Sequence, residues 1–388
     1  MKYHFECSTC GAKYYDTKFM YLCPACEKTN TQDQPPKGVL KTIYDYKNIS
    51  SKFEDLEKNN FLDLMPINSA ESMPNLRVGC TPLYKYESLN QQKLDFSVYF
   101  KDDSQNPTFS FKDRASALVS AYAKENNIDT IVAASTGNAG SSLAGICASQ
   151  NQKAIIYVPA SAPKAKLTQI KMYGAELKPV DGTYDQAFDL SIEATKKYGY
   201  FNRNTAYNPF TIEGKKTVSF ELFSQLEKQI PDTVFVPVGD GVIITGVFKG
   251  FEDLLMLGII DKMPNIIAVQ SEGSKNILAN IETENFVSKA SNTIADSISV
   301  DIPRNFLLCK SYIKKYQTSH LTVTDKEIIE ASVNLSKNTG IFSEPAAATA
   351  FAGFLKFQKE NKIIKNSKNI ILLTGSGLKD LNAVQSIL

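Results

Sequence analysis

From Ile128 onward, the chain alternates short runs of β-branched residues with longer stretches of helical composition. Such runs predict buried strands, and the amphipathic stretches between them predict helices. The strand-like runs span residues 130–134, 154–159, 233–238, 265–270 and 369–373, and the helical stretches span 163–173, 184–198, 213–227, 326–337 and 346–359. A strand, a helix and a second strand in succession favour a parallel sheet. The sequence therefore predicts an α/β protein with parallel-type sheets and helices on both faces.

Length and composition narrow the class of protein further. At about 150 residues per domain, a chain of 388 residues can form two or three domains. Its 43% hydrophobic and 22% charged residues and its formal net charge of +2 are typical of a soluble protein. No stretch approaches the roughly 20 apolar residues that span a bilayer, and no apolar run follows a basic start. We therefore expect neither nucleic acid nor a membrane as a partner, and we expect a cytoplasmic location.

The chain holds only two histidines, His4 and His320, and neither lies in a motif. The sequence therefore gives little support for a Ser-His-Asp or Cys-His mechanism. A lysine that binds a cofactor is a simpler source of chemistry in such a chain.

Four of the seven cysteines form two CxxC pairs near the N-terminus. Cys7 and Cys10 are separated by twelve residues from Cys23 and Cys26, a spacing that can bring four thiolates around one tetrahedral zinc. Four cysteines leave no open position for water, so the zinc would be structural. The alternatives are two redox pairs or a ribbon that has lost its metal. The other cysteines lie in apolar or helical surroundings and are interpreted as packing residues: Cys80, Cys147 and Cys309.

Lys112 lies in the run Asn-Pro-Thr-Phe-Ser-Phe-Lys-Asp-Arg, residues 106–114. The Asn-Pro pair ends any preceding element, Thr108 and Ser110 are N-cap candidates, and residues 115–124 have helical composition. Lys112 is thus predicted in the first turn of a helix, where the helix dipole favours the neutral amine over the ammonium. A neutral amine is what a Schiff-base lysine needs. The alternative is a solvated surface lysine.

Two glycine-containing loops follow predicted strands and precede predicted helices. The first, residues 135–142, would direct backbone N–H groups and hydroxyls at an anion, although a plain strand–helix turn is the alternative. The second begins at Gly239 and precedes a helix predicted near Thr245. Its glycines at 239, 241 and 246 do not fit the dinucleotide pattern G-x-G-x-x-G, and the first acidic residue after the next strand, Glu272, comes too late for a ribose contact. A single mononucleotide-type phosphate fits better.

The run 106–114 resembles the cofactor-lysine segment of the threonine synthases, pyridoxal-phosphate enzymes of the tryptophan-synthase β-like fold, also called fold type II. The resemblance extends from the cysteine ribbon to the C-terminus. It implies two sheets with pyridoxal 5′-phosphate in the cleft between them, bound to Lys112 as a Schiff base. Residues 238–253 are similar to the phosphate loop of zinc-ribbon threonine synthases. Many relatives carry Gly-Asn-x-Gly-Asn there, whereas this chain has Asp240 and Val242, so phosphate binding must depend on backbone N–H groups and the Asp240 carboxylate must point away.

The resemblance also implies the remaining site residues. Asn138 would bind the 3′ oxygen of the cofactor and Thr374 its pyridine nitrogen, and the loop 135–138 would bind the substrate carboxylate. The role of Ser376 is open, because many threonine synthases have histidine or asparagine at that position. The implied cofactor residues are Phe111, Asn138, Gly239, Asp240, Gly241, Val242, Ile243 and Thr374. The implied residues for the substrate carboxylate are Ser135, Thr136 and Gly137. A substrate phosphate needs cationic or N–H partners, for which Lys166, Arg203 and Asn204 are candidates, and a surface charge is the alternative for each.

The activity implied is conversion of O-phospho-L-homoserine and water to L-threonine and phosphate, with Lys112 as the base. The alternatives are elimination from serine or threonine, β-replacement on O-phosphoserine as in cysteate-synthase-like relatives, and a non-catalytic protein that uses the ribbon for contacts. We expect a zinc ribbon at 1–34, a large cofactor-binding core at 35–127 and 183–388, and a small α/β subdomain at 128–182. A homodimer is also expected.

Overall fold

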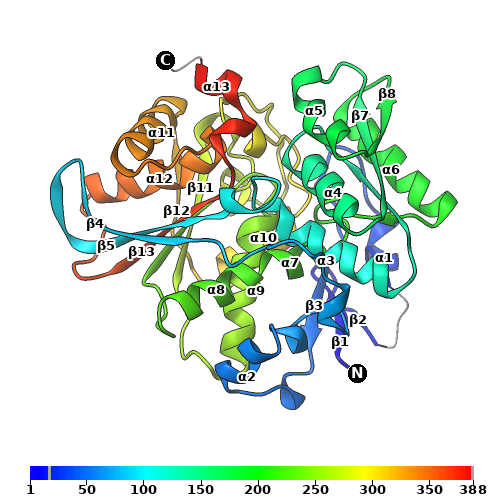
Figure 1. The fold of residues 1–388 in the computed structure, drawn as a ribbon, viewed down its shortest axis with the longest axis horizontal. Helices are drawn as coiled ribbons and strands as arrows, with labels where there is room; N and C mark the ends of the chain where they lie inside the picture. Colours follow the sequence, from blue (N-terminus) through cyan, green and yellow to red (C-terminus); the bar gives the residue numbers. More distant parts are fainter. Residues whose placement is uncertain (16–18, 386–388) are drawn as a thin grey trace.

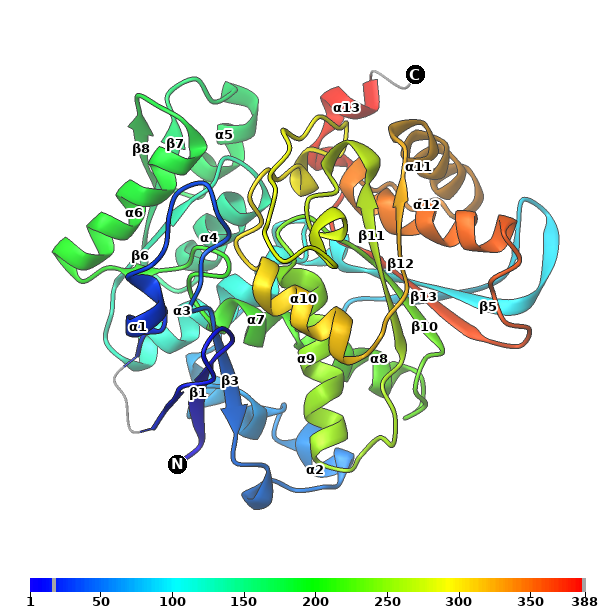
Figure 2. The same cartoon turned by 180° about the vertical axis from the view of Figure 1, so that it is seen from behind.

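The structure is a computed structural model that describes residues 1–15 and 19–385. It contains three sheets, and helices cover both faces of the two larger ones (Figure 1). In Figures 1 and 2 the small unit with helices α4–α6 lies beside the large sheet, and the N-terminal ribbon lies below the small unit. The predicted α/β class is confirmed, and so is the pair of parallel-type sheets.

The large sheet has the strand order β12-β11-β10-β13-β5-β4. All neighbouring strands are parallel except the edge pair β4 and β5, which is antiparallel and was not predicted. The strands are β4 Leu83–Leu89, β5 Gln92–Asp102, β10 Thr233–Pro237, β11 Asn265–Ser271, β12 His320–Val323 and β13 Lys368–Leu373. Strand β10 is buried throughout because both faces are covered.

Alternate residues of β10 enter different cores. Val234 and Val236 pack in one cluster with Phe248, whereas Phe235 packs in another with Phe351. Consecutive strand residues point to opposite faces, so helices must cover both sides. The helices around this sheet are α8 Thr217–Gln225, α9 Val242–Met256, α10 Phe306–Lys315, α11 Asp325–Thr339 and α12 Pro345–Lys359.

The small sheet has the order β8-β7-β6-β9, and all its pairs are parallel. Its strands are β6 Thr130–Ala134, β7 Lys153–Pro159, β8 Glu176–Val180 and β9 Phe201–Asn202, and its helices are α4 Asn138–Ser149, α5 Lys164–Met172 and α6 Tyr184–Tyr198. Thr183 and Gln186 form a capping box at the start of α6, and Gly199 ends the helix with a φ of 71°. Because β9 pairs with β6, we propose that the small unit extends to residue 202, beyond the boundary at 182 suggested by the sequence.

The N-terminal sheet has the order β2-β1-β3 and is antiparallel. It comprises β1 Tyr3–Cys7, β2 Lys13–Tyr14 and β3 Leu40–Tyr44, with the short helix α1 Pro24–Glu27. Strand β3 lies after the predicted end of the ribbon at residue 34, and Tyr44 at its end joins the large core. The ribbon is therefore continuous with the body of the protein.

The remaining helices connect these units. They are α2 Phe53–Lys58, α3 Lys112–Glu125, α7 Phe210–Lys215 and α13 Leu381–Gln385, with short 3₁₀ turns at Tyr46–Asn48, Leu62–Leu64, Ala70–Ser72, Asp103–Gln105, Glu272–Ser274, Leu278–Asn280, Asp296–Ile298 and Gly377–Lys379. The single helix predicted at 213–227 is wrong in detail, because a turn at Lys216 separates α7 from α8. No helix in the described part of the chain is both long and apolar enough to cross a membrane.

The packing role predicted for the three single cysteines holds for two of them. Cys147 and Cys309 are buried, but Cys80 is exposed. Cys80 follows Gly79, and both residues have positive φ, 46° and 78° respectively. The prediction for Cys80 was therefore wrong.

Candidate active site

Lys112 is the first residue of α3, so the prediction that it lies in the first turn of a helix is confirmed. The N-cap is Phe111, and no side chain caps the helix, so the predicted caps were wrong. Thr108 instead donates from its N–H and its hydroxyl to Asp113, at 2.7 and 2.5 Å. Phe111 donates its N–H to the carbonyl of Thr374 at 2.9 Å, which joins the start of α3 to the end of β13.

The amine of Lys112 has no hydrogen bond or ion pair to any other described residue. Burial lowers its pKa, the charge of Glu344 opposes that shift, and the charge of Arg203 adds to it. A lowered pKa raises the fraction of neutral amine, which is the nucleophilic form. The amine is thus free and suited to form a Schiff base.

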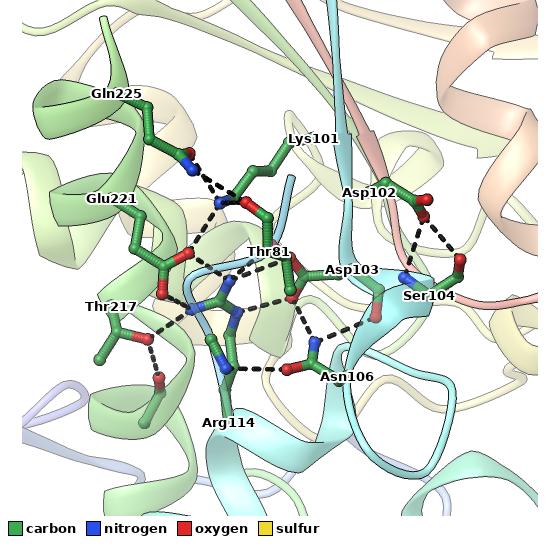
Figure 3. A network of polar contacts seen from close by, with 12 residues as sticks. Thr81, Lys101, Asp102, Asp103, Ser104, Asn106, Arg114, Thr217, Glu221 and Gln225 are labelled. Atoms are coloured by element: carbon green, nitrogen blue, oxygen red, sulfur yellow. Dashed lines mark hydrogen bonds and ion pairs between the residues drawn. The ribbon is translucent and has the colours of Figure 1, made fainter. Parts of the chain in front are cut away.

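A buried ionic network holds the segment that carries Lys112 (Figure 3). Arg114 donates from Nε to Asp103 at 2.6 Å and from Nη1 to Glu221 at 2.6 Å. Lys101 donates to the other oxygen of Glu221 at 2.7 Å. Burial would raise the pKa of Glu221, but the charges of Arg114 and Lys101 outweigh it and hold this pKa at about 2. The network ties α3, α8 and the end of β5 together two residues after Lys112.

Asn106 belongs to the same network. It accepts a hydrogen bond from the Gly79 N–H at 2.9 Å and donates to the Asp103 carbonyl at 3.0 Å. The asparagine of the 106–114 run thus has a structural role in positioning the loop before Lys112.

The loop between β6 and α4 forms one wall of a pocket of about 270 Å³. Thr136, Gly137 and Asn138 line it, and Gly137 is the N-cap of α4. Lys166 and Lys379 line the same pocket. A helix N-terminus can bind an anion such as a carboxylate, and Lys379 lies beside it, whereas Lys166 is paired with Asp296 at 2.8 Å. Ser135 comes directly before this wall and is partly exposed.

In the second loop, between β10 and α9, positions 239 and 241 have no space for a side chain. A Cβ on Gly239 would lie 2.8 Å from the Cα of Ile298, and one on Gly241, whose φ is 84°, would lie 2.9 Å from the Cβ of Cys309. Helix α9 begins at Val242, three residues before the predicted start near Thr245. The glycines therefore lead directly into the N-terminus of α9. Its free backbone N–H groups can bind a phosphate. Ile243 follows in the first turn.

Asp240 in this loop accepts a hydrogen bond from the backbone N–H of Arg304 at 2.6 Å. Burial raises the pKa of the Asp240 carboxyl, and the Arg304 N–H opposes that shift. Its carboxylate is thus held by the segment before α10.

Thr374 directly follows β13 and is buried, and its hydroxyl makes no hydrogen bond to any described residue. It can therefore bond a ring nitrogen, as the family resemblance implies. Ser376 instead accepts a hydrogen bond from the N–H of Leu378 at 3.3 Å and caps the 3₁₀ turn after it. A free amine at Lys112, a free hydroxyl at Thr374 and a cradle that admits only glycine fit pyridoxal phosphate.

The three candidates for a substrate phosphate lie in different surroundings. Asn204 accepts from the Ala134 N–H at 2.8 Å and donates to the Ser191 hydroxyl at 2.7 Å, so both ends of its amide are used. Lys166 forms an ion pair with Asp296 at 2.8 Å. Arg203 is buried beside Lys112 and donates from Nη2 to its carbonyl at 3.4 Å.

Sequence reasoning gave no role to two residues that the structure places at the site. Glu344 accepts from the Asn138 amide at 3.0 and 3.1 Å. Lys379 donates to the hydroxyl of Ser141 at 2.7 Å, and burial lowers the pKa of Lys379 to about 8. Both lie in family-like segments, Ser-Glu-Pro and Thr-Gly-Ser-Gly-Leu-Lys-Asp, and that similarity was the available signal.

The four ribbon cysteines lie together. Their sulfur atoms all lie within 4.8 Å of one another, and the Cys7–Cys26 and Cys10–Cys23 sulfurs are each 3.8 Å apart. Zinc–sulfur bonds of about 2.3 Å in a tetrahedron give sulfur–sulfur distances of about 3.8 Å. The thiols therefore fit a closed zinc site.

Comparison with known proteins identifies the class. Residues 75–375 match the family model described as pyridoxal-phosphate dependent enzyme, and the chain belongs to this family. Within it, the chain is similar to proteins named threonine synthase. The one from Methanocaldococcus jannaschii is 34% identical over 97% of this chain and 93% of the relative, and the one from Methanosarcina acetivorans is 32% identical over 98% and 93%. The predicted family resemblance is confirmed.

Solved structures agree with the fold. The processed form of threonine deaminase isoform 2 from Solanum lycopersicum has a TM-score of 0.71 at 22% identity and covers 87% of this chain and 94% of its own. Maize serine racemase has a TM-score of 0.67 at 24% identity and covers 79% and 91%. These similarities confirm the predicted fold type II architecture.

Proposed function

We propose that this protein is a threonine synthase, which converts O-phospho-L-homoserine and water to L-threonine and phosphate. The observation that carries the proposal is the unpaired amine of Lys112, on which two nearby charges act: that of Glu344, which is bonded to Asn138 at the start of α4, and that of Asp240, in the loop before α9. One helix N-terminus suits the cofactor phosphate and the other suits the substrate carboxylate. Relatives named threonine synthase that match almost the whole chain support the choice of reaction.

The cofactor, when bound, supplies the electron-withdrawing ring that makes the protons at the substrate Cα and Cβ acidic. Lys112 would hold the cofactor, and its amine would accept and return protons at these carbons. The Cγ–O bond breaks and phosphate leaves with the electron pair, Cγ gains a proton, and water adds its oxygen to Cβ. Ser135, Thr136 and Gly137 hold the carboxylate during these steps.

The other residues position the cofactor. Residues Gly239 to Ile243 bind its phosphate through backbone N–H groups, and Phe111 lies at the start of α3 beside it. The Thr374 hydroxyl bonds the pyridine nitrogen, and Asn138 bonds the 3′ oxygen. Zinc on Cys7, Cys10, Cys23 and Cys26 is structural in this proposal, and the enzyme is a cytoplasmic homodimer.

A substrate panel tests the proposal. Phosphate and threonine released from O-phospho-L-homoserine are measured beside phosphate from O-phosphoserine and ammonia from serine and threonine. Phosphohomoserine should have the highest kcat/KM, with equal amounts of threonine and phosphate formed. A preference for serine or threonine with release of ammonia would favour elimination, and a preference for phosphoserine would favour β-replacement.

A further inference from the structure

Two buried cationic side chains beside Lys112 lack a carboxylate partner. Arg203 is 1% exposed and Lys215 is fully buried, and neither forms an ion pair within residues 1–15 and 19–385. Other buried cations of this protein are paired: Lys216 lies 2.7 Å from Asp253, and Arg114 is bound by Asp103. A buried charge without a partner is costly, so such a pair points to an anion supplied from outside the chain.

The two side chains keep donors free. Arg203 donates from Nε to the Ser116 hydroxyl at 3.0 Å and from Nη2 to the Lys112 carbonyl at 3.4 Å. The amine of Lys215 donates to the Thr205 hydroxyl at 3.1 Å. Within the described ranges, Nη1 of Arg203 and the other protons of the Lys215 amine have no acceptor. Several N–H donors therefore converge next to the reactive lysine.

The nearby carboxylates are engaged elsewhere. Asp240, whose charge acts on Lys215, accepts from the Arg304 N–H at 2.6 Å. Asp113, whose charge acts on Arg203, accepts from Thr108 at 2.7 Å. Burial, followed by the charges of Arg203 and Lys112, lowers the pKa of Lys215 well below its ordinary value. A dianion is the ligand that would best restore the ammonium.

These side chains come from other segments than the cofactor-phosphate loop, although the charge of Asp240 in that loop acts on Lys215. Lys215 ends α7, and Arg203 and Thr205 follow β9, whereas the loop 239–242 offers backbone N–H groups at the start of α9. If the substrate amine lies at Lys112 and its carboxylate at the start of α4, the γ-substituent is the charged group still to be bound. We propose that Arg203, Lys215 and the Thr205 hydroxyl bind the phosphate group of the substrate.

This inference rests on the proposed function for the identity of the phosphate ester, and it makes the site a determinant of specificity. An unphosphorylated amino acid would leave Arg203 and Lys215 buried without an anion, and a site built for a charged group rejects analogues that lack it. Asn204, whose amide is used to join β6 to α6, takes no part.

The test measures binding of inorganic phosphate to the cofactor-loaded enzyme by calorimetry. In Lys215→Met the Kd for phosphate should rise at least about tenfold, because hydrogen bonds to a charged group are lost. Thr205→Val, which keeps the volume and every charge, should raise the Kd about threefold or more. The exposed Lys262→Gln removes one surface charge and should leave the Kd within about twofold.

Thermal unfolding provides the second readout. Phosphate should raise the Tm of the parent and have much less effect on Lys215→Met. Without phosphate, this variant should melt no lower than the parent, because it removes an unpaired buried amine. A purely structural lysine would instead lower the Tm with and without phosphate.

Three outcomes would overturn the inference. The first is a parent that does not bind phosphate, and the second is a pair of variants, at 205 and 215, that bind phosphate as the parent does. The third is a Lys215→Met variant that needs at least about tenfold more pyridoxal phosphate for saturation, since Arg203 and Lys215 would then bind the cofactor. Failure of the proposed function is distinct. A parent that does not convert phosphohomoserine, with phosphate affinity still lost in Lys215→Met, would reject the reaction and retain the anion site.

Discussion

The amide of Asn138, at the start of α4, donates to both carboxylate oxygens of Glu344, at the start of α12, at 3.0 and 3.1 Å. These helices pack on the small and the large sheet, so the hydrogen bond joins the two units. Burial raises the pKa of Glu344, and the Asn138 amide and the charge of Lys112 oppose that shift. Glu344 thereby orients the side chain that we propose for the 3′ oxygen of the cofactor.

Replacing Glu344 by Gln should therefore weaken cofactor binding by about tenfold, because Asn138 loses a charged acceptor. The folded-state pKa is raised above the unfolded value, so ionisation of Glu344 lowers stability as pH rises above the unfolded pKa. Glu344→Gln should consequently be at least as stable as the parent at neutral pH. Cofactor titration and thermal unfolding check both points, and a Tm at pH 7 well below that of the parent would contradict the second.

The Arg114 network should contribute to stability in a pH-dependent way. Its carboxylate Glu221 has a pKa lowered to about 2, so the stabilisation is present above the unfolded pKa of about 4.5 and is lost as pH falls toward 2. Glu221→Gln should cost about 3 kcal/mol at pH 7, since it leaves Arg114 and Lys101 partly unpaired. Urea unfolding at several pH values measures this, and the gap between variant and parent should narrow below pH 4. An equal gap at all pH values would count against the ion pairs.

Zinc in the ribbon is tested by metal analysis of freshly purified, reduced protein. One zinc per chain is expected, and Cys10→Ser should lose it, because three thiolates no longer close the tetrahedron. Cys80→Ser removes an exposed thiol outside the ribbon and should keep the metal. A chelator should increase proteolysis within the first thirty or so residues while the visible absorption of the bound cofactor persists. Absence of zinc in the parent would show a ribbon without metal.

The phosphate cradle predicts a loss of cofactor affinity in Gly239→Ala. The added Cβ would lie 2.8 Å from the backbone of Ile298, so the loop must shift and its N–H groups lose their alignment. We expect the Kd for pyridoxal phosphate to rise at least about tenfold. Gly258→Ala is the control, because its φ of 69° strains the backbone but no atom lies within 4 Å of the new Cβ. Equal cofactor affinity in both variants would mean that the loop does not hold the phosphate.

The parts of the fold that sequence predicted best are strands buried on both faces. The run 130–134 coincides with β6, and β10 ends one residue before the predicted position. Strand β8, Glu-Leu-Lys-Pro-Val, was missed because it is a partly exposed edge with lysine and proline, and β9 was missed because it has only two residues. Local pattern detects burial on both faces, but it does not detect short edges.

A similar limit applies to the site. Lys112 and the two glycine-containing loops were found because each is contiguous in sequence and the chemistry of each can be recognised locally. The Asn138–Glu344 contact joins residues 206 positions apart, and nothing in either segment indicates the other. That Lys215 has no carboxylate partner among the described residues can likewise be seen only in the folded structure. In sequence Glu213 lies two positions away, but in the fold it pairs with Lys216.

Reduction with borohydride tests the central claim, that Lys112 carries the cofactor, most directly. The cofactor-loaded protein is reduced, digested and analysed by mass spectrometry for the lysine that bears the pyridoxyl group. We predict modification of Lys112 alone, with loss of visible absorption, and neither in Lys112→Ala. Modification of another buried lysine such as Lys215, or visible absorption that borohydride does not fix to Lys112, would contradict the account.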